Sequence, residues 1–179
     1  AAQFPEQLYQ CLHQGACSDT TASDGRYVMD TNYAYSCTLL EFCAAEMIPL
    51  IYASSAATYG ALTGFREQAD CEGPLNVYGY SKLLFDQRVR RLPPGGPQVV
   101  GLRYFNVYGP RMDIHGAYTE VLIRWMERIH SGQPPLIFGD GNQTMDFVYI
   151  EDVARANILA AQSDVSDEVF NIASGVETS

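Results

Sequence analysis

The sequence PLIYA at residues 49–53, which runs directly into SSAATYG at residues 54–60, decides the fold. Residues 49–53 form a short, continuous apolar run, which is typical of a buried strand. The small and hydroxyl-bearing residues that follow are typical of a turn. In an open α/β sheet, ligands bind outside the carboxyl ends of the strands. The stretch therefore predicts a buried strand whose end brings polar groups to a ligand site.

Strand and helix patterns alternate outward from this stretch. Apolar runs predict further strands over residues 8–13, 99–105 and 169–172, with short strand candidates at 136–138 and 147–150. Helical periodicity and capping residues predict helices over residues 24–46, 78–91, 119–130 and 152–161, the first of them capped by Asp24. Strands that alternate with helices favour an α/β fold, in which helices cover both faces of a parallel sheet.

The Gly-rich turn that opens a doubly wound dinucleotide-binding sheet does not occur in this sequence. That turn holds a pyrophosphate at a helix N-terminus, and neither G-x-G-x-x-G nor G-x-x-G-x-x-G is present. Either the fold belongs to another class, or roughly the first two βα units lie outside the sequence. We expect an incomplete doubly wound, Rossmann-like parallel sheet over residues 1–108. A boundary is expected near Gly109, where the regular alternation of strands and helices gives way to smaller elements over residues 109–179.

The composition favours a globular protein and argues against nucleic-acid binding, a membrane span and a metal site. The chain has 179 residues, of which 47% are hydrophobic and 18% charged, as in an ordinary globular protein. A formal net charge of -10 argues against nucleic acid as a partner. No apolar run approaches membrane-spanning length, so we expect a cytoplasmic protein that does not enter a membrane. The five cysteines form no C-x-x-C pair, which favours reduced thiols and no metal site.

Tyr78 and Lys82 carry the sharpest chemical signal. They belong to the sequence YGYSK at residues 78–82 and share one face of the predicted helix, since they lie one helical turn apart. A phenol has a reference pKa of about 10 and is a poor base at neutral pH. We expect the Lys82 ammonium to lower the pKa of Tyr78, which would then accept a proton from a substrate hydroxyl as hydride leaves the carbon. An exposed helix with an incidental Tyr and Lys is the alternative interpretation.

Two strand ends add polar groups to this pair. Ser54 and Ser55 follow the strand at residues 49–53, and the sequence RYFNVYGPR at residues 103–111 ends the next predicted strand. A serine at such a position can donate a hydrogen bond to the reacting oxygen and complete a Ser–Tyr–Lys set. Ordinary turn chemistry is the alternative explanation for the two serines.

These three segments, in this order, resemble the extended short-chain dehydrogenase/reductase superfamily, which includes nucleotide-sugar epimerases and dehydratases. The resemblance covers nearly the whole chain and corresponds to the middle and later portions of such an enzyme. It implies that residues 109–179 are part of a small C-terminal substrate-binding region. It implies that Ser55, Tyr78 and Lys82 are catalytic, with Tyr78 as the base. The residues that it implies for binding NAD or NADP are Gly15, Ala16, Cys17, Asn32, Tyr78, Lys82, Phe105 and Val107. Those implied for binding substrate are Ser55, Asn106, Arg124 and Phe138.

Ala56 and Ala57 indicate the reaction type within this superfamily. Its dehydratases carry an Asp-Glu pair just after the serine or threonine, because elimination of water needs an acid and a base. The two alanines therefore favour epimerisation, in which a nucleotide sugar is oxidised to a keto-sugar and re-reduced with bound NAD(P). The resemblance thus implies a nucleotide-sugar substrate and a homo-oligomeric complete enzyme. Without its Gly-rich turn, the chain alone is expected to bind NAD(P) weakly and to associate through an exposed strand edge.

The two parts of the sequence resemble different epimerases. Residues 12–108 look most like the ADP-L-glycero-D-manno-heptose 6-epimerases, which favours that activity and a place in lipopolysaccharide biosynthesis. From Gly109 onward the sequence looks more like the UDP-hexose 4-epimerases, which are the first alternative.

Two positions depart from the heptose enzymes. His115 stands where those enzymes carry a second catalytic Lys, and it is either an acid/base near pH 7 or a loop residue. Met145 stands where an Arg often grips the diphosphate, and a thioether cannot bind an anion in this way. Together with the missing Gly-rich turn, these departures keep a second alternative open, namely an inactive fragment or a non-catalytic module.

Overall fold

A sheet of four parallel strands forms the centre of the molecule, with strand order β1-β2-β3-β6. The computed structural model describes residues 10–62, 64–112, 121–137 and 139–179. The strands of the sheet are β1 (Cys11–His13), β2 (Leu50–Ser55), β3 (Val99–Tyr104) and β6 (Glu168–Ile172). The run at residues 49–53 is thus a central strand, as predicted, and the expected parallel sheet is confirmed.

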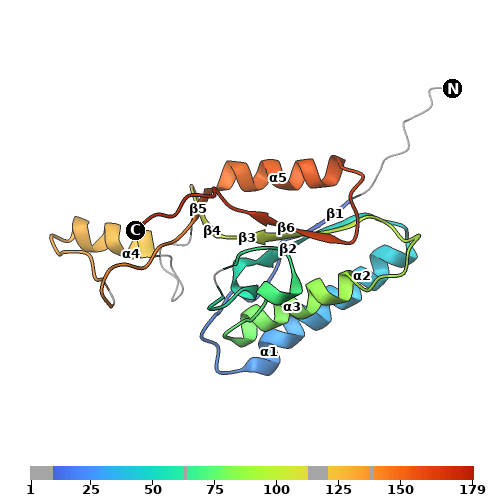
Figure 1. Ribbon diagram of the computed structural model, residues 1–179, viewed down its shortest axis with the longest axis horizontal. Coiled ribbons are helices and arrows are strands. Elements are labelled where there is room, and N and C mark those ends of the chain that lie inside the picture. The colour runs from blue at the N-terminus through green and yellow to red at the C-terminus, as the bar shows by residue number, and fades with distance from the viewer. Residues whose placement is uncertain (1–9, 63, 113–120, 138) are drawn as a thin grey trace.

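Helices cover both faces of this sheet (Figure 1). One face carries α5 (Ile150–Gln162), and the other carries α2 (Tyr35–Ala45) and α3 (Val77–Val89). The helix α5 begins two residues before the predicted start at Asp152. Because helices bury both faces, the central strands are apolar on both sides, which explains why their sequences read as continuous apolar runs.

The predicted helix over residues 24–46 is interrupted by a π-helical segment. It begins as α1 (Gly25–Met29) and reaches α2 through η1 (Asp30–Ala34). Asp24 caps it as predicted, because the Asp24 carboxylate accepts a hydrogen bond from the Tyr27 amide at 3.1 Å. π-Helical turns are rare and often mark functional positions, but the apolar periodicity of this stretch gave no sign of one.

The two faces of the sheet enclose separate apolar clusters. The cluster under α2 and α3 consists of Leu40, Cys43, Leu50, Tyr52, Phe85, Val89, Val99 and Val169. The cluster under α5 consists of Ile51, Val100 and Leu102, with Ala160, Ala161 and Ile172 packed against them. Successive residues of β2 and β3 alternate between the two clusters, so both strands are held rigidly and their carboxyl ends are fixed in space.

A smaller parallel sheet lies beyond the carboxyl end of β3. It pairs β4 (Asn106–Tyr108) with β5 (Phe147–Tyr149), and α4 (Val121–His130) belongs to the same part of the chain. The strand predicted at residues 136–138 is wrong for Leu136 and Ile137, which lie in an irregular segment, while Phe138 lies outside the described residues. Leu136 and Ile137 are apolar, but none of the strands described for the chain pairs with them.

Residues after Gly109 return to the main sheet. β6 pairs with β3 in parallel, with Gly101 opposite Val169 and Tyr104 opposite Ile172. The part of the chain after the predicted boundary therefore supplies one strand of the main sheet and, through α5, one of its covering helices. The division at Gly109 into two functional regions stays a prediction. None of the described helices combines the length and apolar character needed to cross a membrane.

Gly79 allows the first turn of α3 to lie directly on the turn that follows β2. That turn begins with the short 3-10 helix η2 (Ala56–Thr58). A Cβ atom on Gly79 would lie 2.5 Å from the Ala57 carbonyl oxygen and 3.0 Å from Pro74 Cβ. Only glycine fits between these atoms, because real Cβ atoms do not approach backbone so closely.

Replacing Gly79 with Ala should therefore destabilise the full-length protein, although Ala favours helices more than Gly does. The overpacking is expected to cost about 1–3 kcal/mol in the free energy of unfolding, measured by urea denaturation. Gly96→Ala is the matched control, since a Cβ there meets nothing within 4 Å, and it should change stability by less than about 0.5 kcal/mol. Equal effects of the two substitutions would contradict the close approach at Gly79.

Candidate active site

A cavity of about 790 Å³ lies at the carboxyl ends of the central strands. It is lined by residues from the segments after β1, β2 and β3, from the start of α3 and from the start of α4. Those residues are Gln14, Ala16, Ser18, Thr20, Ala53, Ser54, Ser55, Ala56, Ala57, Tyr78, Lys82, Tyr104, Phe105, Asn106, Val107 and Val121. The three side chains of the predicted Ser–Tyr–Lys set all line this one cavity.

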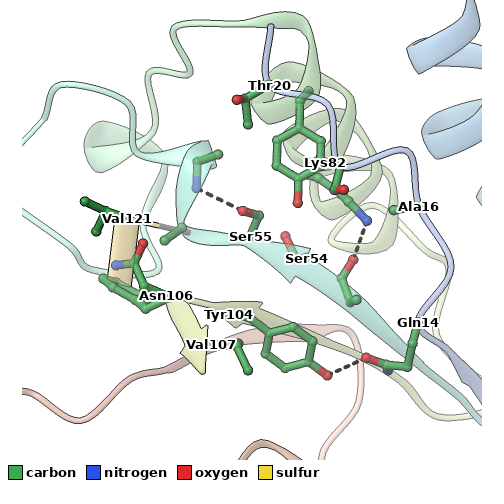
Figure 2. A pocket seen from close by; sticks show the side chains of 16 residues that line it. Gln14, Ala16, Thr20, Ser54, Ser55, Lys82, Tyr104, Asn106, Val107 and Val121 are labelled. Carbon is green, nitrogen blue, oxygen red and sulfur yellow. Dashed lines mark hydrogen bonds between the residues drawn. The ribbon is translucent and has the colours of Figure 1, made fainter. Parts of the chain in front are cut away.

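Ser55 is the last residue of β2 and the N-cap of η2. Its hydroxyl oxygen accepts a hydrogen bond from the Ala57 amide at 3.1 Å, so the sharp turn after the strand orients the side chain. Figure 2 shows Ser55 and Lys82 extending from β2 and α3 toward the same space. The capping bond leaves the hydroxyl hydrogen of Ser55 available for a second partner.

Tyr78 and Lys82 come from the first turns of α3, which Asn76 caps. The Asn76 side-chain oxygen accepts a hydrogen bond from the Gly79 amide at 2.8 Å and fixes the start of the helix. Lys82 is 6% exposed, and its Nζ donates to the Ala53 carbonyl oxygen at 2.8 Å. The same Nζ lies 6.0 Å from the centre of the Tyr78 ring. The ammonium is thus anchored to β2, beside the phenol.

Burial shifts the pKa of both groups toward their neutral forms. It lowers the pKa of Lys82 to about 8, although the nearby Asp86 carboxylate acts in the opposite direction. Burial also raises the pKa of Tyr78, and the hydrogen bond with the Ser55 hydroxyl only partly offsets that effect. The expectation that Lys82 would lower the pKa of Tyr78 is therefore wrong for the chain alone. The reason is that desolvation of the phenolate outweighs an ammonium whose hydrogen bond goes to Ala53.

Asn32 lies behind the cavity and not on its wall. It is 2% exposed within the π-helical segment η1. Its side-chain oxygen accepts from the Cys17 amide at 2.7 Å, and its Nδ2 donates to the Cys17 carbonyl and to Ser81 Oγ at 3.0 and 3.1 Å. Asn32 thereby ties the loop after β1 to α3. Ala16 of that loop lines the main cavity, and Gly15 lines a shallower hollow next to it.

Of the other predicted site residues, some line the cavity, one does not, and two lie outside the described residues. Phe105, Asn106 and Val107 line the cavity, and Asn106 Nδ2 donates to the Asp146 carbonyl oxygen at 2.9 Å. Arg124 is exposed on α4 and is not among the described residues that line the cavity. His115 and Phe138 lie outside the described residues, so their predicted roles stay predictions. Within the described ranges, no group of three His, Cys, Asp or Glu side chains is arranged to hold a metal ion.

Sequence reasoning missed a ring of hydrogen bonds on one wall of the cavity. Tyr104 donates its hydroxyl hydrogen to the Gln14 amide oxygen at 2.8 Å and accepts from Asn157 Nδ2 at 2.8 Å. Gln14 Nε2 closes the ring by donating to Asn157 Oδ1 at 3.0 Å. The ring joins the loop after β1, the end of β3 and α5, and Figure 2 shows its Tyr104–Gln14 edge. Tyr104 is the last residue of β3 and lies within the strand predicted at residues 99–105, and its position at the strand end was the available signal for it.

Several solved structures of nucleotide-sugar enzymes are similar to this chain. The ADP-L-glycero-D-manno-heptose-6-epimerase of Helicobacter pylori is 39% identical over 93% of this chain and 53% of that one, with a TM-score of 0.82. The UDP-glucose 4-epimerase of Thermotoga maritima, solved with UDP-glucose, is 31% identical over 93% of this chain and 56% of that one, with a TM-score of 0.81.

A third similar structure has a different bound ligand. It is the UDP-N-acetylglucosamine 4-epimerase of Methanobrevibacter ruminantium M1, in complex with UDP-N-acetylmuramic acid. It is 30% identical over 95% of this chain and 56% of that one, with a TM-score of 0.87. The chain thus spans little more than half the length of these three proteins.

The family model of the NAD dependent epimerase/dehydratase family matches residues 1–173. That match covers the whole of the cavity described above, from Gln14 to Val121. The chain therefore belongs to the NAD-dependent epimerase/dehydratase family.

Proposed function

We propose that this chain carries the catalytic residues of a nucleotide-sugar epimerase, which inverts a sugar stereocentre by oxidation to a keto-sugar and re-reduction with bound NAD or NADP. The observation that carries the proposal is the single cavity into which Ser55, Tyr78 and Lys82 bring a hydroxyl, a phenol and an amine. Since the chain spans 53% to 56% of the enzymes compared above, the activity is proposed for the full-length protein.

The residues of the cavity fit the nicotinamide end of a dinucleotide. Ala16, Phe105 and Val107 supply apolar surface for a flat ring, and the Lys82 amine and the Tyr78 hydroxyl supply polar partners for a ribose. When bound, NAD(P) takes up the hydride of the substrate and returns it. The predicted role of Asn32 is indirect, because the Asn32 amide shapes the loop that carries Ala16 and does not face the cavity.

Tyr78 is the group that moves the proton. In the oxidising half-reaction, the Tyr78 phenolate accepts the proton of the sugar hydroxyl, and in the reducing half-reaction the phenol returns it. The Ser55 hydroxyl donates a hydrogen bond to the same oxygen and so orients it. Lys82, with a pKa of about 8, is mostly an ammonium at pH 7, and its Nζ lies 6.0 Å from the centre of the Tyr78 ring. Because burial raises the pKa of Tyr78, the phenol must first lose its own proton to solvent before it can accept the proton of the sugar hydroxyl.

Ala56 and Ala57 support epimerisation over dehydration. Both residues line the cavity directly beyond Ser55, at the position where elimination of water would need carboxylates. Neither alanine can donate or accept a proton. The keto intermediate would therefore be reduced again and not dehydrated.

The proposed substrate is an ADP-glycero-manno-heptose, with inversion at C6. Its support is the 39% identity to the Helicobacter pylori heptose enzyme, against 30% and 31% for the two 4-epimerases. A UDP-hexose 4-epimerase is the second candidate. It is favoured by the higher TM-score of the Methanobrevibacter ruminantium 4-epimerase, 0.87 against 0.82 for the heptose enzyme. The similarity of the sequence after Gly109 to UDP-hexose 4-epimerases also favours it.

Tyr78→Phe in the full-length enzyme should lower turnover by about 10² or more, because it removes the hydroxyl that exchanges the proton. Tyr80→Phe is the matched control, since Tyr80 lies on the same helix and is 50% exposed. It should retain turnover within a factor of about two, in line with a surface change of under 0.5 kcal/mol. Epimer formation is followed by proton NMR. Near-normal turnover of Tyr78→Phe would remove Tyr78 from the mechanism.

The two substrate candidates are separated by incubating the full-length enzyme with ADP-glycero-manno-heptose and, separately, with UDP-glucose. We expect NMR to show a new heptose epimer and unchanged UDP-glucose. Conversion of UDP-glucose to its C4 epimer, with the heptose left unchanged, would instead establish the second candidate. Failure to convert either compound by an enzyme with bound NAD(P) would contradict the epimerase proposal for both.

A further inference from the structure

Asp86 is a buried carboxylate directly behind the catalytic face of α3. It lies one helical turn beyond Lys82, just as Lys82 lies one turn beyond Tyr78, so the three side chains share one face of the helix. Asp86 is fully buried, and it accepts hydrogen bonds from the Tyr52 and Ser54 hydroxyls, each at 2.9 Å. A carboxylate in this position is stable only with such partners, because a bare buried charge is very costly.

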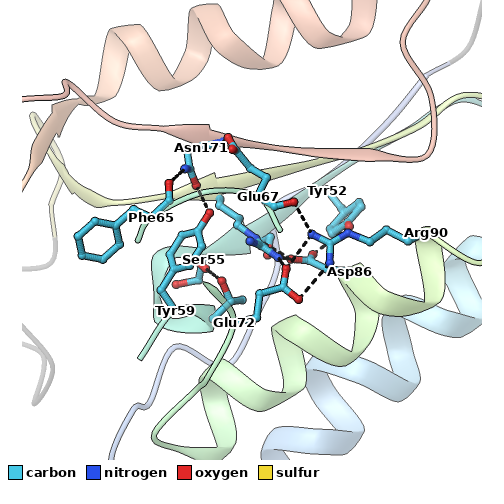
Figure 3. A network of polar contacts seen from close by, with 12 residues as sticks. Tyr52, Ser55, Tyr59, Phe65, Glu67, Glu72, Asp86, Arg90 and Asn171 are labelled. Atoms are coloured by element: carbon cyan, nitrogen blue, oxygen red, sulfur yellow. Dashed lines mark hydrogen bonds and ion pairs between the residues drawn. The ribbon is translucent and has the colours of Figure 1, made fainter. Parts of the chain in front are cut away.

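Arg103 is the charged partner of Asp86. Its Nε and Nη2 lie 2.9 and 2.8 Å from Asp86 Oδ2, and its side chain is 0% exposed. Arg103 Nη2 also donates to Glu72, whose carboxylate pairs with Arg90 at 2.7 Å. The guanidinium carbon lies 4.9 Å from the centre of the Tyr59 ring. Figure 3 shows Glu72, Asp86 and Arg90 converging in the space between the sheet and α3.

The partners of Asp86 stand immediately next to the lining of the cavity. Ser54 precedes Ser55 on β2, and Arg103 precedes Tyr104 on β3, with Ser54 and Arg103 opposite each other in the sheet. The network therefore joins β2, β3 and α3 one residue, or one helical turn, behind the groups that line the cavity. Hydrogen bonds to a charged group are short and directional, so this junction fixes both the depth and the rotation of α3 on the sheet.

We propose that Asp86, held by Arg103, is a positioning residue that locks Tyr78 and Lys82 opposite Ser55 and places a negative charge one helical turn behind the Lys82 amine. The inference rests on the proposed function, because positioning of Lys82 by Asp86 affects activity only if Lys82 takes part in the reaction. It explains why a domain core contains an ion network where apolar residues would pack at lower electrostatic cost.

The charges around Lys82 support this assignment. On its own helix, Lys82 faces Tyr78 and Asp86, and the Asp86 charge acts against the burial that lowers the pKa of Lys82. From β1, the pKa of His13 is lowered by burial and by the Lys82 charge, so His13 adds no positive charge near pH 7. From β2, the Ala53 carbonyl oxygen accepts the hydrogen bond of the ammonium. Within the described part of the chain, Asp86 is the anion that acts on Lys82.

The test is a pH titration of Lys82 itself in the full-length protein, by NMR of lysine labelled with ¹³C at Cε. Lys82 is the only lysine in the 179 residues, and its signal is assigned by its loss in Lys82→Arg. We expect Asp86→Asn to shift the titration of Lys82 downward by about 1 pH unit or more, since an opposite charge has been removed. The alkaline limb of kcat against pH should move in the same direction, because the ammonium is lost at lower pH.

Tyr52→Phe is the matched control for structural damage. It removes one hydrogen bond from the same carboxylate but leaves the charge, so it should weaken folding without shifting the titration of Lys82. If Asp86→Asn does not fold, the double variant Asp86→Leu, Arg103→Met replaces the buried pair with apolar residues of similar size, which proteins tolerate. It should show the same downward shift.

An unshifted titration in Asp86→Asn or in the double variant, or an equal shift in Tyr52→Phe, would overturn the inference. These outcomes are distinct from failure of the proposed function. The titration of Lys82 is measured without substrate, whereas the function fails if the wild-type enzyme converts no nucleotide sugar.

Discussion

A buried charge must be paired, and in this fold the charge that must be paired is the carboxylate of Asp86. Its hydrogen bonds come from Tyr52 and Ser54 on β2 and from Arg103 on β3. Because Asp86 belongs to α3, these hydrogen bonds hold the two strands and α3 in one relative position. On the other side of the same junction, the phenol and the amine of α3 meet the hydroxyl at the end of β2 in one cavity. The relative positions of the side chains in the cavity thus depend on the hydrogen bonds that the core donates to the Asp86 carboxylate.

Much of this arrangement could be predicted from sequence because its signals are local. The apolar run at residues 49–53 predicted a central strand, Asp24 predicted a helix start, and the spacing of Tyr78 and Lys82 placed both on one helical face. What escaped prediction depends on partners distant in sequence. β4 exists because Asn106 pairs with Phe147, whereas Leu136 and Ile137 remain irregular although both are apolar. No local pattern tells these two cases apart.

The site shows the same division between local and distant effects. Ser55, Tyr78 and Lys82 were found from their motifs, but the direction of the Tyr78 pKa was not, since it depends on how deeply the whole fold buries the phenol. Asn32 was predicted to bind the cofactor, and that role stays a prediction. Its side-chain amide forms hydrogen bonds with the Cys17 backbone and with Ser81. Its influence on the cavity passes through the loop that it holds.

The central claim is that the cavity supports reversible hydride removal from a sugar carbon. It is tested most directly by giving the full-length enzyme, with bound NAD(P), a nucleotide sugar deuterated at the stereocentre that inverts, and by following the label with mass spectrometry in ordinary water. Transfer of hydride to the cofactor and back predicts that the deuterium stays on that carbon in the epimerised product. Replacement of the deuterium by solvent hydrogen at that carbon during epimerisation would show a proton abstraction from carbon and contradict the account.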